Sequence, residues 1–560
     1  MKRIRLFTAV LVLSITSVLL TTFVSAQRRG ADIYAITNAK IIPIAGPVIE
    51  HGTIVIRDGL ITAVGENVKA PADATIIDGT GLNVYPGLFD TNSTLGLAAP
   101  SPVPSPGGGG GFVQAQLRQP SAPAGPNSTQ PPGLQPESMV EDSVKPGGTD
   151  IETARTNGIT TVLTAPRSGI WMGQSALLNL DGDTAQQMIV RSPVAMHVGF
   201  TPLRTGGYPS SLMGVFASLR QMMLDAQRYQ KAQEIYERSP RGMRRPDLDR
   251  SLAALVPVLE RKLPVVMYAD SEREIERALD LAQEFKLRVI IAGGREAATV
   301  ANRLHDQDVP VLLSINFPKR TTSASPDADP ETLRTLRMRV EAQKTAAKLA
   351  TAKVRFAFQS DGLTNIADYR ANIGKAIENG LSADAALRAV TLSAAEILGV
   401  NDRLGSIETG KIANLTLTRG DLFDRTGRIT NVFIDGHLIE IKAAPAITPT
   451  TAAGTTPTEA RPAMAGTWAI NVDVSGQSLP GTIIIRQDGD SLSGSIQTQL
   501  GNSDFSGGTL SGNTFHFVSN ANIQGQAVQL TIDGTINGNT MTGTVNSPFG
   551  TQTLTGTRQP

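Results

Sequence analysis

After about residue 33 the chain alternates apolar and polar residues in short runs, a pattern typical of half-buried β-strands. Residues 53–56 and 61–64 are two such runs, and the Asp58-Gly59 pair between them predicts a tight hairpin turn. Similar β-type sequence returns at residues 405–441. We therefore expect residues 33–85 and 401–441 to form one small composite β-sandwich domain.

Between residues 86 and 400 the pattern changes to apolar strands that are each followed by an amphipathic helix. Residues 263–268 form a buried-type strand before a helical stretch at 272–285, and residues 288–292 begin the next such pair. Repeated βα units indicate a parallel sheet, and over about 300 residues they predict a TIM (β/α)8 barrel. Two insertions interrupt this α/β region. Residues 98–136 are rich in proline and glycine, whereas residues 206–246 predict a long helix.

Residues 442–462 are dominated by threonine, proline and alanine, so they predict a linker that buries no core. About eight short β-type runs follow in residues 463–560, separated by turn signals such as Asp488-Gly489-Asp490. This pattern predicts a separate all-β domain at the C-terminal end, either an up-and-down β-barrel or a sandwich.

The first 26 residues predict a cleavable signal peptide. Lys2, Arg3 and Arg5 precede an apolar run at 6–24, and the small residues Ser25 and Ala26 fit a processing site. A membrane anchor is the alternative, because the run is long enough to span a bilayer. We expect an exported protein of the periplasm or the extracellular space.

The amino-acid composition excludes several classes of function. The absence of cysteine excludes disulfides, thiolate nucleophiles and cysteine-ligated zinc. Lys and Arg total 51 against 50 Asp and Glu, which gives no electrostatic case for nucleic acid or for an anionic membrane surface.

The segment Tyr85-Pro86-Gly87-Leu88-Phe89-Asp90 carries the most informative motif. It resembles the amidohydrolase superfamily, particularly exported imidazolonepropionase-like members, in which this leader precedes His-x-His at the end of the first barrel strand. Matches at residues 158–162, 394–400 and 403–415 follow in the family's order, so the resemblance covers roughly residues 33–441. It implies a barrel that hydrolyses C–N bonds of cyclic amide-type compounds or dipeptides with zinc or another divalent metal.

The resemblance also shows where this chain departs from the family. Asn92 and Thr94 stand at the two histidine positions of the first strand, Tyr268 at that of the fifth and Ala292 at that of the sixth. Only Asp361 matches a family ligand, the aspartate that binds metal and moves protons on the eighth strand. Amide, hydroxyl and phenol oxygens are poor ligands for transition metals. We therefore expect no metal and no other cofactor.

Asp361 has two readings, a metal-independent general base or a retained structural carboxylate. The other candidates for a substrate pocket are His197, Asp270, Trp171 and Gln174, in addition to Asn92, Thr94 and Tyr268. Each has a structural alternative as well. His197 could be a hydrogen-bonded strand residue, Asp270 the cap of the helix that contains Glu272 and Glu274, and Trp171 a packing residue.

Three functions remain open at this point. One is a divergent amidohydrolase, the second a catalytically inactive ligand-binding protein or pseudoenzyme, and the third an envelope-binding role for the C-terminal β domain. The expected partner is a small-molecule ligand or substrate, not nucleic acid. Homo-oligomerisation and pairing with an active relative also stay open.

Overall fold

The computed structural model describes residues 33–97, 130–203, 208–319, 331–441 and 464–559, apart from residues 361, 364 and 425 and five two-residue gaps in the last range. The expected signal peptide, most of the first insertion and the expected linker lie outside these residues. The chain divides into two compact units, Met1–Pro445 and Ala446–Pro560. Within the described part, no helix combines the length and apolarity needed to cross a membrane.

The two β-type segments that flank the barrel in sequence share one sheet, with the order β18-β17-β16-β5-β1-β2-β3 and β4 paired to β1. Its strands are β1 (Tyr34–Ile41), β2 (Ile49–Arg57), β3 (Leu60–Gly65), β4 (Thr75–Asp78), β5 (Asn83–Pro86), β16 (Leu415–Arg419), β17 (Arg428–Ile434) and β18 (His437–Glu440). The expected hairpin is present, because Asp58 and Gly59 have φ of 52° and 80° between β2 and β3. Antiparallel pairing of β5 with β16 joins the two segments.

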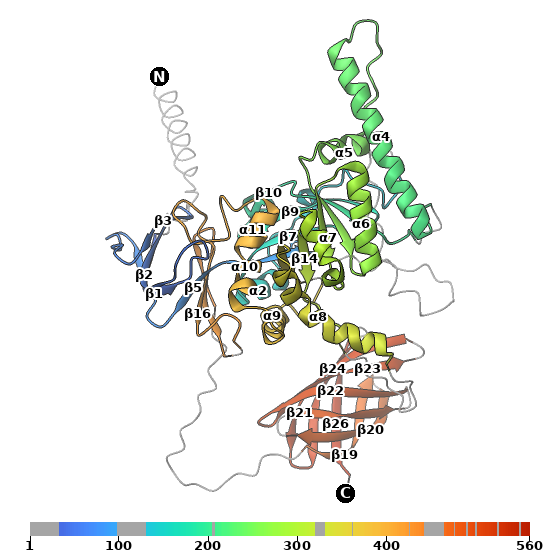
Figure 1. The fold of residues 1–560 in the computed structure, drawn as a ribbon. Coiled ribbons are helices and arrows are strands. Elements are labelled where there is room, and N and C mark those ends of the chain that lie inside the picture. Colours follow the sequence, from blue (N-terminus) through green and yellow to red (C-terminus); the bar gives the residue numbers. More distant parts are fainter. Residues whose placement is uncertain are drawn as a thin grey trace, which may run out of the picture. The chain divides into compact units, whose positions relative to one another are not determined.

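The α/β part that follows contains seven parallel strands among the described residues (Figure 1). They are β6 (Leu88–Ser93), β7 (Ile159–Thr164), β11 (Met196–Gly199), β12 (Val265–Ala269), β13 (Val289–Gly293), β14 (Val311–Ser314) and β15 (Phe356–Gln359). Between β7 and β11 the chain runs antiparallel as β8 (Trp171–Gln174) and β9 (Ala176–Asn179). This departs from the eight βα repeats that the sequence predicts. Only residues 165–170 separate β7 from β8, too few for the crossover that a parallel strand needs.

Helices cover the outer face of these strands (Figure 1). They include α2 (Thr149–Thr156), α3 (Ala185–Met188), α6 (Glu272–Phe285), α7 (Ala301–Asp306), α8 (Leu333–Thr351), α9 (Asp368–Glu378), α10 (Ala383–Ala389) and α11 (Leu392–Leu398), with a short strand β10 (Ile189–Arg191) after α3. Because side chains alternate along a strand, Met267 and Ile291 pack outward against helices, whereas Val266 and Ile290 fill the interior. The barrel is therefore a packed core rather than a pore.

Strands β6 and β15 lie next to one another through side-chain contacts. Thr91 Oγ1 donates to the Phe358 carbonyl at 2.8 Å, and the Ser360 N–H donates to Asp90 Oδ1 at 2.8 Å. The Tyr369 hydroxyl donates to the Phe89 carbonyl at 2.6 Å. These polar side chains thus satisfy backbone groups where the two strands meet.

A long helix, α4 (Leu212–Arg238), projects from the barrel together with the start of α5 (Arg250–Leu259) (Figure 1). It confirms the helix expected in the second insertion. Ser211 caps it by accepting from the Gly214 N–H, and its buried residues all lie between Val215 and Ala226. The second half of α4 therefore stands clear of the barrel core. We call residues 227–250 the arm.

The second unit is a closed barrel of eight antiparallel strands, β19 to β26, in which each strand pairs with the next and β26 returns to β19. The strands are β19 (Gly466–Val474), β20 (Gln477–Asp488), β21 (Ser491–Thr498), β22 (Gly501–Ser511), β23 (Thr514–Ile523), β24 (Gln526–Asn537), β25 (Thr540–Ser547) and β26 (Gly550–Arg558). Trp468, Phe515 and Phe517 are buried in its interior. Of the two predicted alternatives, barrel and sandwich, the structure confirms the barrel.

Candidate functional site

Three residues that the sequence singled out meet inside the α/β barrel. Tyr268 on β12 lies between His197 on β11 and Asn92 on β6. Its hydroxyl is 3.1 Å from His197 Nδ1 and 3.0 Å from Asn92 Oδ1. Asn92 Nδ2 donates in turn to Gln359 Oε1 on β15 at 2.5 Å, and Gln359 Nε2 donates to the Leu312 carbonyl at 2.7 Å. Five strands, β6, β11, β12, β14 and β15, thus supply one continuous polar chain.

The donor and the acceptor in each hydrogen bond of this chain can be assigned by starting from its last member, the Leu312 carbonyl. The Leu312 carbonyl can only accept, so the Gln359 amide donates there and offers its oxygen to Asn92. Asn92 then accepts the single hydroxyl proton of Tyr268. His197 must therefore donate from Nδ1 to the phenol oxygen, which assigns the tautomer with a bare Nε2.

Burial controls the charges around this chain. Burial, and then the positive charge of Arg167, lowers the pKa of His197 to about 3, so the imidazole is neutral at pH 7. Its Nε2 is buried and has no hydrogen-bond partner in the described part of the protein. Burial also raises the pKa of Asp90, although hydrogen bonds from Ser360 and Asn92 oppose the shift. The interior therefore holds a neutral histidine in the hydrogen-bond chain and a desolvated carboxyl on β6, two residues before Asn92.

The other positions that correspond to metal ligands do not join the chain. Thr94 is exposed beyond the end of β6, and Ala292 is buried and apolar. Asp361 lies outside the described residues. Within the described ranges, no three His, Cys, Asp or Glu side chains gather as a metal site.

The donor set that is present does not fit a transition metal. The oxygen atoms of Asn92 and Gln359 already accept hydrogen bonds, and the Tyr268 oxygen accepts one from His197. His197 Nε2 and Asp90 Oδ2 both have no hydrogen-bond partner among the described residues. One imidazole nitrogen and one carboxylate oxygen are fewer than the three or four ligands that zinc requires, and no third His, Cys, Asp or Glu side chain of the described residues joins them.

Two further candidates hold a neighbouring segment in place. Gln174 is buried, its Nε2 donates to the Pro136 carbonyl at 3.1 Å, and its N–H donates to the Ser138 carbonyl at 2.8 Å. The Trp171 side chain is buried, and its carbonyl accepts from the Gln135 N–H at 3.0 Å. Through these hydrogen bonds, both residues hold the segment 130–139 alongside β8.

Asp270 was expected to cap the helix after β12, and this was wrong. Ser271 is the N-cap of α6, and it forms a capping box with Glu274. The Glu274 carboxylate accepts from the Asp270 and Ser271 N–H groups at 3.1 and 3.0 Å. The Asp270 carboxylate instead lies 3.6 Å from Arg295 Nη1. Ser271 takes the N-cap position because its side chain fits the capping box, whereas the Asp270 carboxylate can reach the next βα loop.

Sequence reasoning missed Gln359, Asp90 and Arg167. Gln359 lies two residues before Asp361, and the period of a strand places such residues on the same face, so it could have been found. Asp90 belongs to the leader motif, but no role was assigned to it. Arg167 lies in the short loop after β7 and reaches the Asn92 carbonyl at 3.5 Å, a contact without a local sequence signal.

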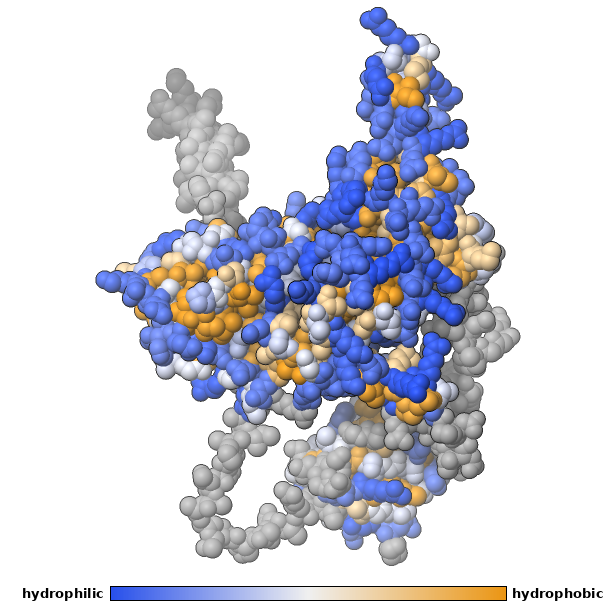
Figure 2. Space-filling model, viewed as in Figure 1, coloured by the Kyte–Doolittle hydropathy of each residue, from blue (hydrophilic) through white to orange (hydrophobic). Residues whose placement is uncertain are grey.

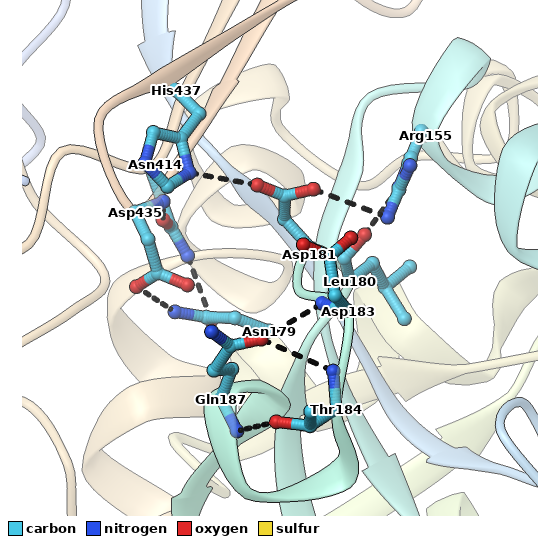
Figure 3. A network of polar contacts seen from close by, with 10 residues as sticks. All are labelled: Arg155, Asn179, Leu180, Asp181, Asp183, Thr184, Gln187, Asn414, Asp435 and His437. Atoms are coloured by element: carbon cyan, nitrogen blue, oxygen red, sulfur yellow. Dashed lines mark hydrogen bonds and ion pairs between the residues drawn. The ribbon is translucent and has the colours of Figure 1, made fainter. Parts of the chain in front are cut away.

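A second polar network surrounds Asn179 (Figure 3). Asn179 is the last residue of β9, and it pairs with Thr161 in the first half of β7. Asn414 Nδ2 donates to Asn179 Oδ1 at 2.8 Å and to Thr161 Oγ1 at 3.0 Å, while Asn179 Nδ2 donates to Asp435 Oδ1 at 2.6 Å. Asp181 accepts from His437 at 2.8 Å in the same region. The network joins the β17–β18 turn to the amino-terminal end of the barrel, where residues serve stability rather than chemistry.

The fold and this interior define a TIM-barrel-type protein with a polar site between the barrel strands. Residues 212–439 match the family model described as Amidohydrolase family, so the chain contains an amidohydrolase-family domain. The match begins with α4 and ends in β18, and therefore does not include the leader motif at residues 85–90.

A solved structure agrees with this assignment of the fold. An amidohydrolase from Thermotoga maritima superposes with a TM-score of 0.61 at 24% identity, covering 73% of this chain and 100% of that one. This similarity concerns the fold alone.

Two curated relatives share short segments with the chain. An enamidase of Eubacterium barkeri is 53% identical over 51 residues, which are 9% of this chain. A 5'-deoxyadenosine deaminase of Methanosarcina acetivorans is 48% identical over 66 residues, 11% of this chain. The chain spans only 13% and 15% of the length of these two relatives.

Proposed function

We propose that this protein is an exported, divergent amidohydrolase that holds a small cyclic amide-type compound or a dipeptide at the barrel mouth, with hydrolysis strongly altered or lost. The observation that carries the proposal is the hydrogen-bond chain from His197 through Tyr268 and Asn92 to Gln359. Two of its members, Asn92 and Tyr268, stand at positions where the resemblance implies metal ligands. The names of the two curated relatives, an enamidase and a deaminase, support a ligand that contains a C–N bond.

The chemistry of the chain supports binding better than hydrolysis. Water becomes a good nucleophile at neutral pH when a metal or a base polarises it. A neutral histidine with a pKa of about 3 is too weak a base for this task. Asp361 is the one remaining family carboxylate, so any residual hydrolysis is assigned to it.

The second candidate is a catalytically inactive ligand-binding or scaffold protein of the cell envelope. The observation that favours it is that the amide groups of Asn92 and Gln359 are both buried and both engaged in the internal hydrogen-bond chain. In this case the barrel keeps its fold and binds a ligand, but it performs no reaction.

One experiment separates the two candidates and tests both. The purified full chain is incubated with a panel of cyclic amides, imides and dipeptides, with and without added zinc or manganese, and turnover and thermal shifts are measured. We expect weak or no turnover, no stimulation by metal, and a shift of the melting temperature by at least one class of compound. Turnover that depends on one equivalent of metal would refute the proposal. Binding without any turnover would favour the inactive protein.

A further inference from the structure

The end of the arm is strongly basic and exposed. Arg238, Arg241, Arg244 and Arg245 occur within eight residues that contain no acidic residue, and all four are exposed. Met243 lies among them with 45% of its surface exposed, and Leu248 follows with 72% exposed. Arg244 contacts Asp247 at 3.5 Å, but both side chains are about nine-tenths exposed, so this pair contributes little. We call residues 238–248 the tip.

The same arm carries a groove of opposite charge. The groove has a volume of about 330 Å³ and lies between α4 and α5. Its lining includes the exposed Glu234 and Glu237 together with Glu260, and the half-buried apolar residues Ala253 and Val256. Glu260 is engaged with Lys262 at 2.8 Å and with Gln230 at 3.2 Å. Glu234 and Glu237 are therefore the acidic groups that a visiting side chain would meet.

We propose that the arm is a self-association surface, in which the tip of one copy occupies the groove of a second copy and the reverse contact forms at the same time. The arginines of the tip complement Glu234 and Glu237, and Met243 complements the apolar lining. The tip and the acidic residues Glu234 and Glu237 belong to the same arm. A twofold axis between two copies therefore produces two identical contacts, as in most homodimers. Glu234 and Arg238 are four residues apart, or about 6 Å along the helix. Two arms that cross can therefore bring Glu234 of each copy close to Arg238 of the other copy.

The charges around the tip argue against an anionic membrane surface as the partner. The arm has four acidic residues, Glu234, Glu237, Asp247 and Asp249, interspersed among seven basic ones. An acidic membrane would therefore repel part of the surface that its arginines bring close. Figure 2 shows the end of the arm as mostly hydrophilic with apolar side chains below it, rather than as an apolar face that could enter a bilayer.

Charge reversal on each half tests the proposal with the full-length protein. The tip variant is Arg241→Glu/Arg245→Glu and the groove variant is Glu234→Arg/Glu237→Arg. The control is Lys69→Glu/Lys145→Glu, which reverses two exposed lysines away from the arm. Sedimentation velocity over a concentration series measures the dimer dissociation constant of each protein, and circular dichroism checks folding.

We expect the wild type and the control to dimerise alike, and each arm variant to bind itself at least about tenfold more weakly, because like charges then face each other. An equal mixture of the two arm variants should restore the dimer, since the reversed tip now meets the reversed groove. A wild type that stays monomeric at about 100 μM, or a mixture that stays monomeric, would overturn the proposal. Wild-type monomers that float with phosphatidylglycerol vesicles would instead assign the tip to a lipid surface.

Discussion

The Tyr268 hydroxyl donates a hydrogen bond to Asn92 Oδ1 at 3.0 Å, 176 residues away in sequence. Both residues stand where the family resemblance places a histidine. Because the hydroxyl of one satisfies the amide oxygen of the other, the two residues form a matched hydrogen-bonded pair. A buried hydrogen bond of this kind is costly to break from one side only, since the remaining partner stays desolvated. Five predictions follow from this site and from the organisation of the chain.

The purified protein should contain far less than one equivalent of zinc, iron, nickel or manganese per chain. The physical reason is that Asn92, Tyr268 and Gln359 use their oxygen atoms in hydrogen bonds, and that Thr94 and Ala292 offer no ligand to the interior. Elemental analysis after dialysis against a mild chelator measures the content. Stoichiometric metal that survives the chelator would contradict the prediction and require ligands outside the described residues.

Tyr268→Phe should destabilise the protein by roughly 1–3 kcal/mol, the cost of leaving buried partners unpaired. The change removes only the hydroxyl, so Asn92 Oδ1 and His197 Nδ1 both lose their hydrogen bond while the packing is kept. Urea unfolding of the first unit measures the difference. Tyr236→Phe on the arm is the matched control and should change stability by less than about 0.5 kcal/mol.

Stability should fall as the pH is lowered from 6.5 towards 3, and His197 should account for part of the slope. The folded protein holds this imidazole neutral with a pKa of about 3, whereas the unfolded chain has the ordinary value of 6.5. The unfolded state therefore binds more protons in this window, which favours unfolding by up to about 1.4 kcal/mol per pH unit. Asp90, whose pKa burial raises, acts in the opposite sense.

His197→Gln isolates the contribution of the histidine. The variant should unfold with a shallower dependence of its free energy on pH between 6.5 and 4, while the exposed His305→Gln should keep the wild-type slope. Urea titrations at a series of pH values provide the comparison. Equal slopes for all three proteins would show that His197 is protonated without penalty.

Asp361→Asn should lower any hydrolytic turnover by roughly 100-fold or more, the usual scale for removal of a general base. The substitution keeps the shape of the side chain and removes its basicity. Initial rates on whichever compound the substrate panel identifies are compared with those of Asp402→Asn, an exposed aspartate. If Asp361→Asn turned over substrate like the wild type, the reaction would have to be assigned to other residues.

Residues 463–560 should fold alone, and protease should release them by cutting within residues 443–462. The warrant is a closed barrel with its own buried core, which includes Trp468 and Phe515, next to a stretch rich in Thr, Pro and Ala. Thermal unfolding of the isolated segment, followed by circular dichroism, should be cooperative. A gradual loss of signal would show that the segment depends on the rest of the chain.

Much of the fold could be predicted because it depends on local pattern. The Asp58-Gly59 turn, the strand-helix alternation after residue 263 and the hairpins of the last hundred residues each result from sequence neighbours. The antiparallel stretch β8–β9 was not predicted, because strand direction there is decided by the length of the preceding loop and by the partners on both sides. Asp270 was misread because the neighbouring Ser271 takes the N-cap position, while Arg295, which is distant in sequence, attracts the Asp270 carboxylate.

The sequence by itself determined which residue types stand at the positions of the resemblance, among them Asn92, Thr94 and Tyr268, since this is a matter of residue identity. Only the tertiary structure decided what takes their place, because the chain from His197 to Gln359 joins strands that lie up to 267 residues apart. The distinction between Asn92, which is buried in that chain, and Thr94, which is exposed, is likewise set by the end of β6 rather than by residue type. Hydrogen bonds act over about 3 Å, and only folding brings such groups within that distance.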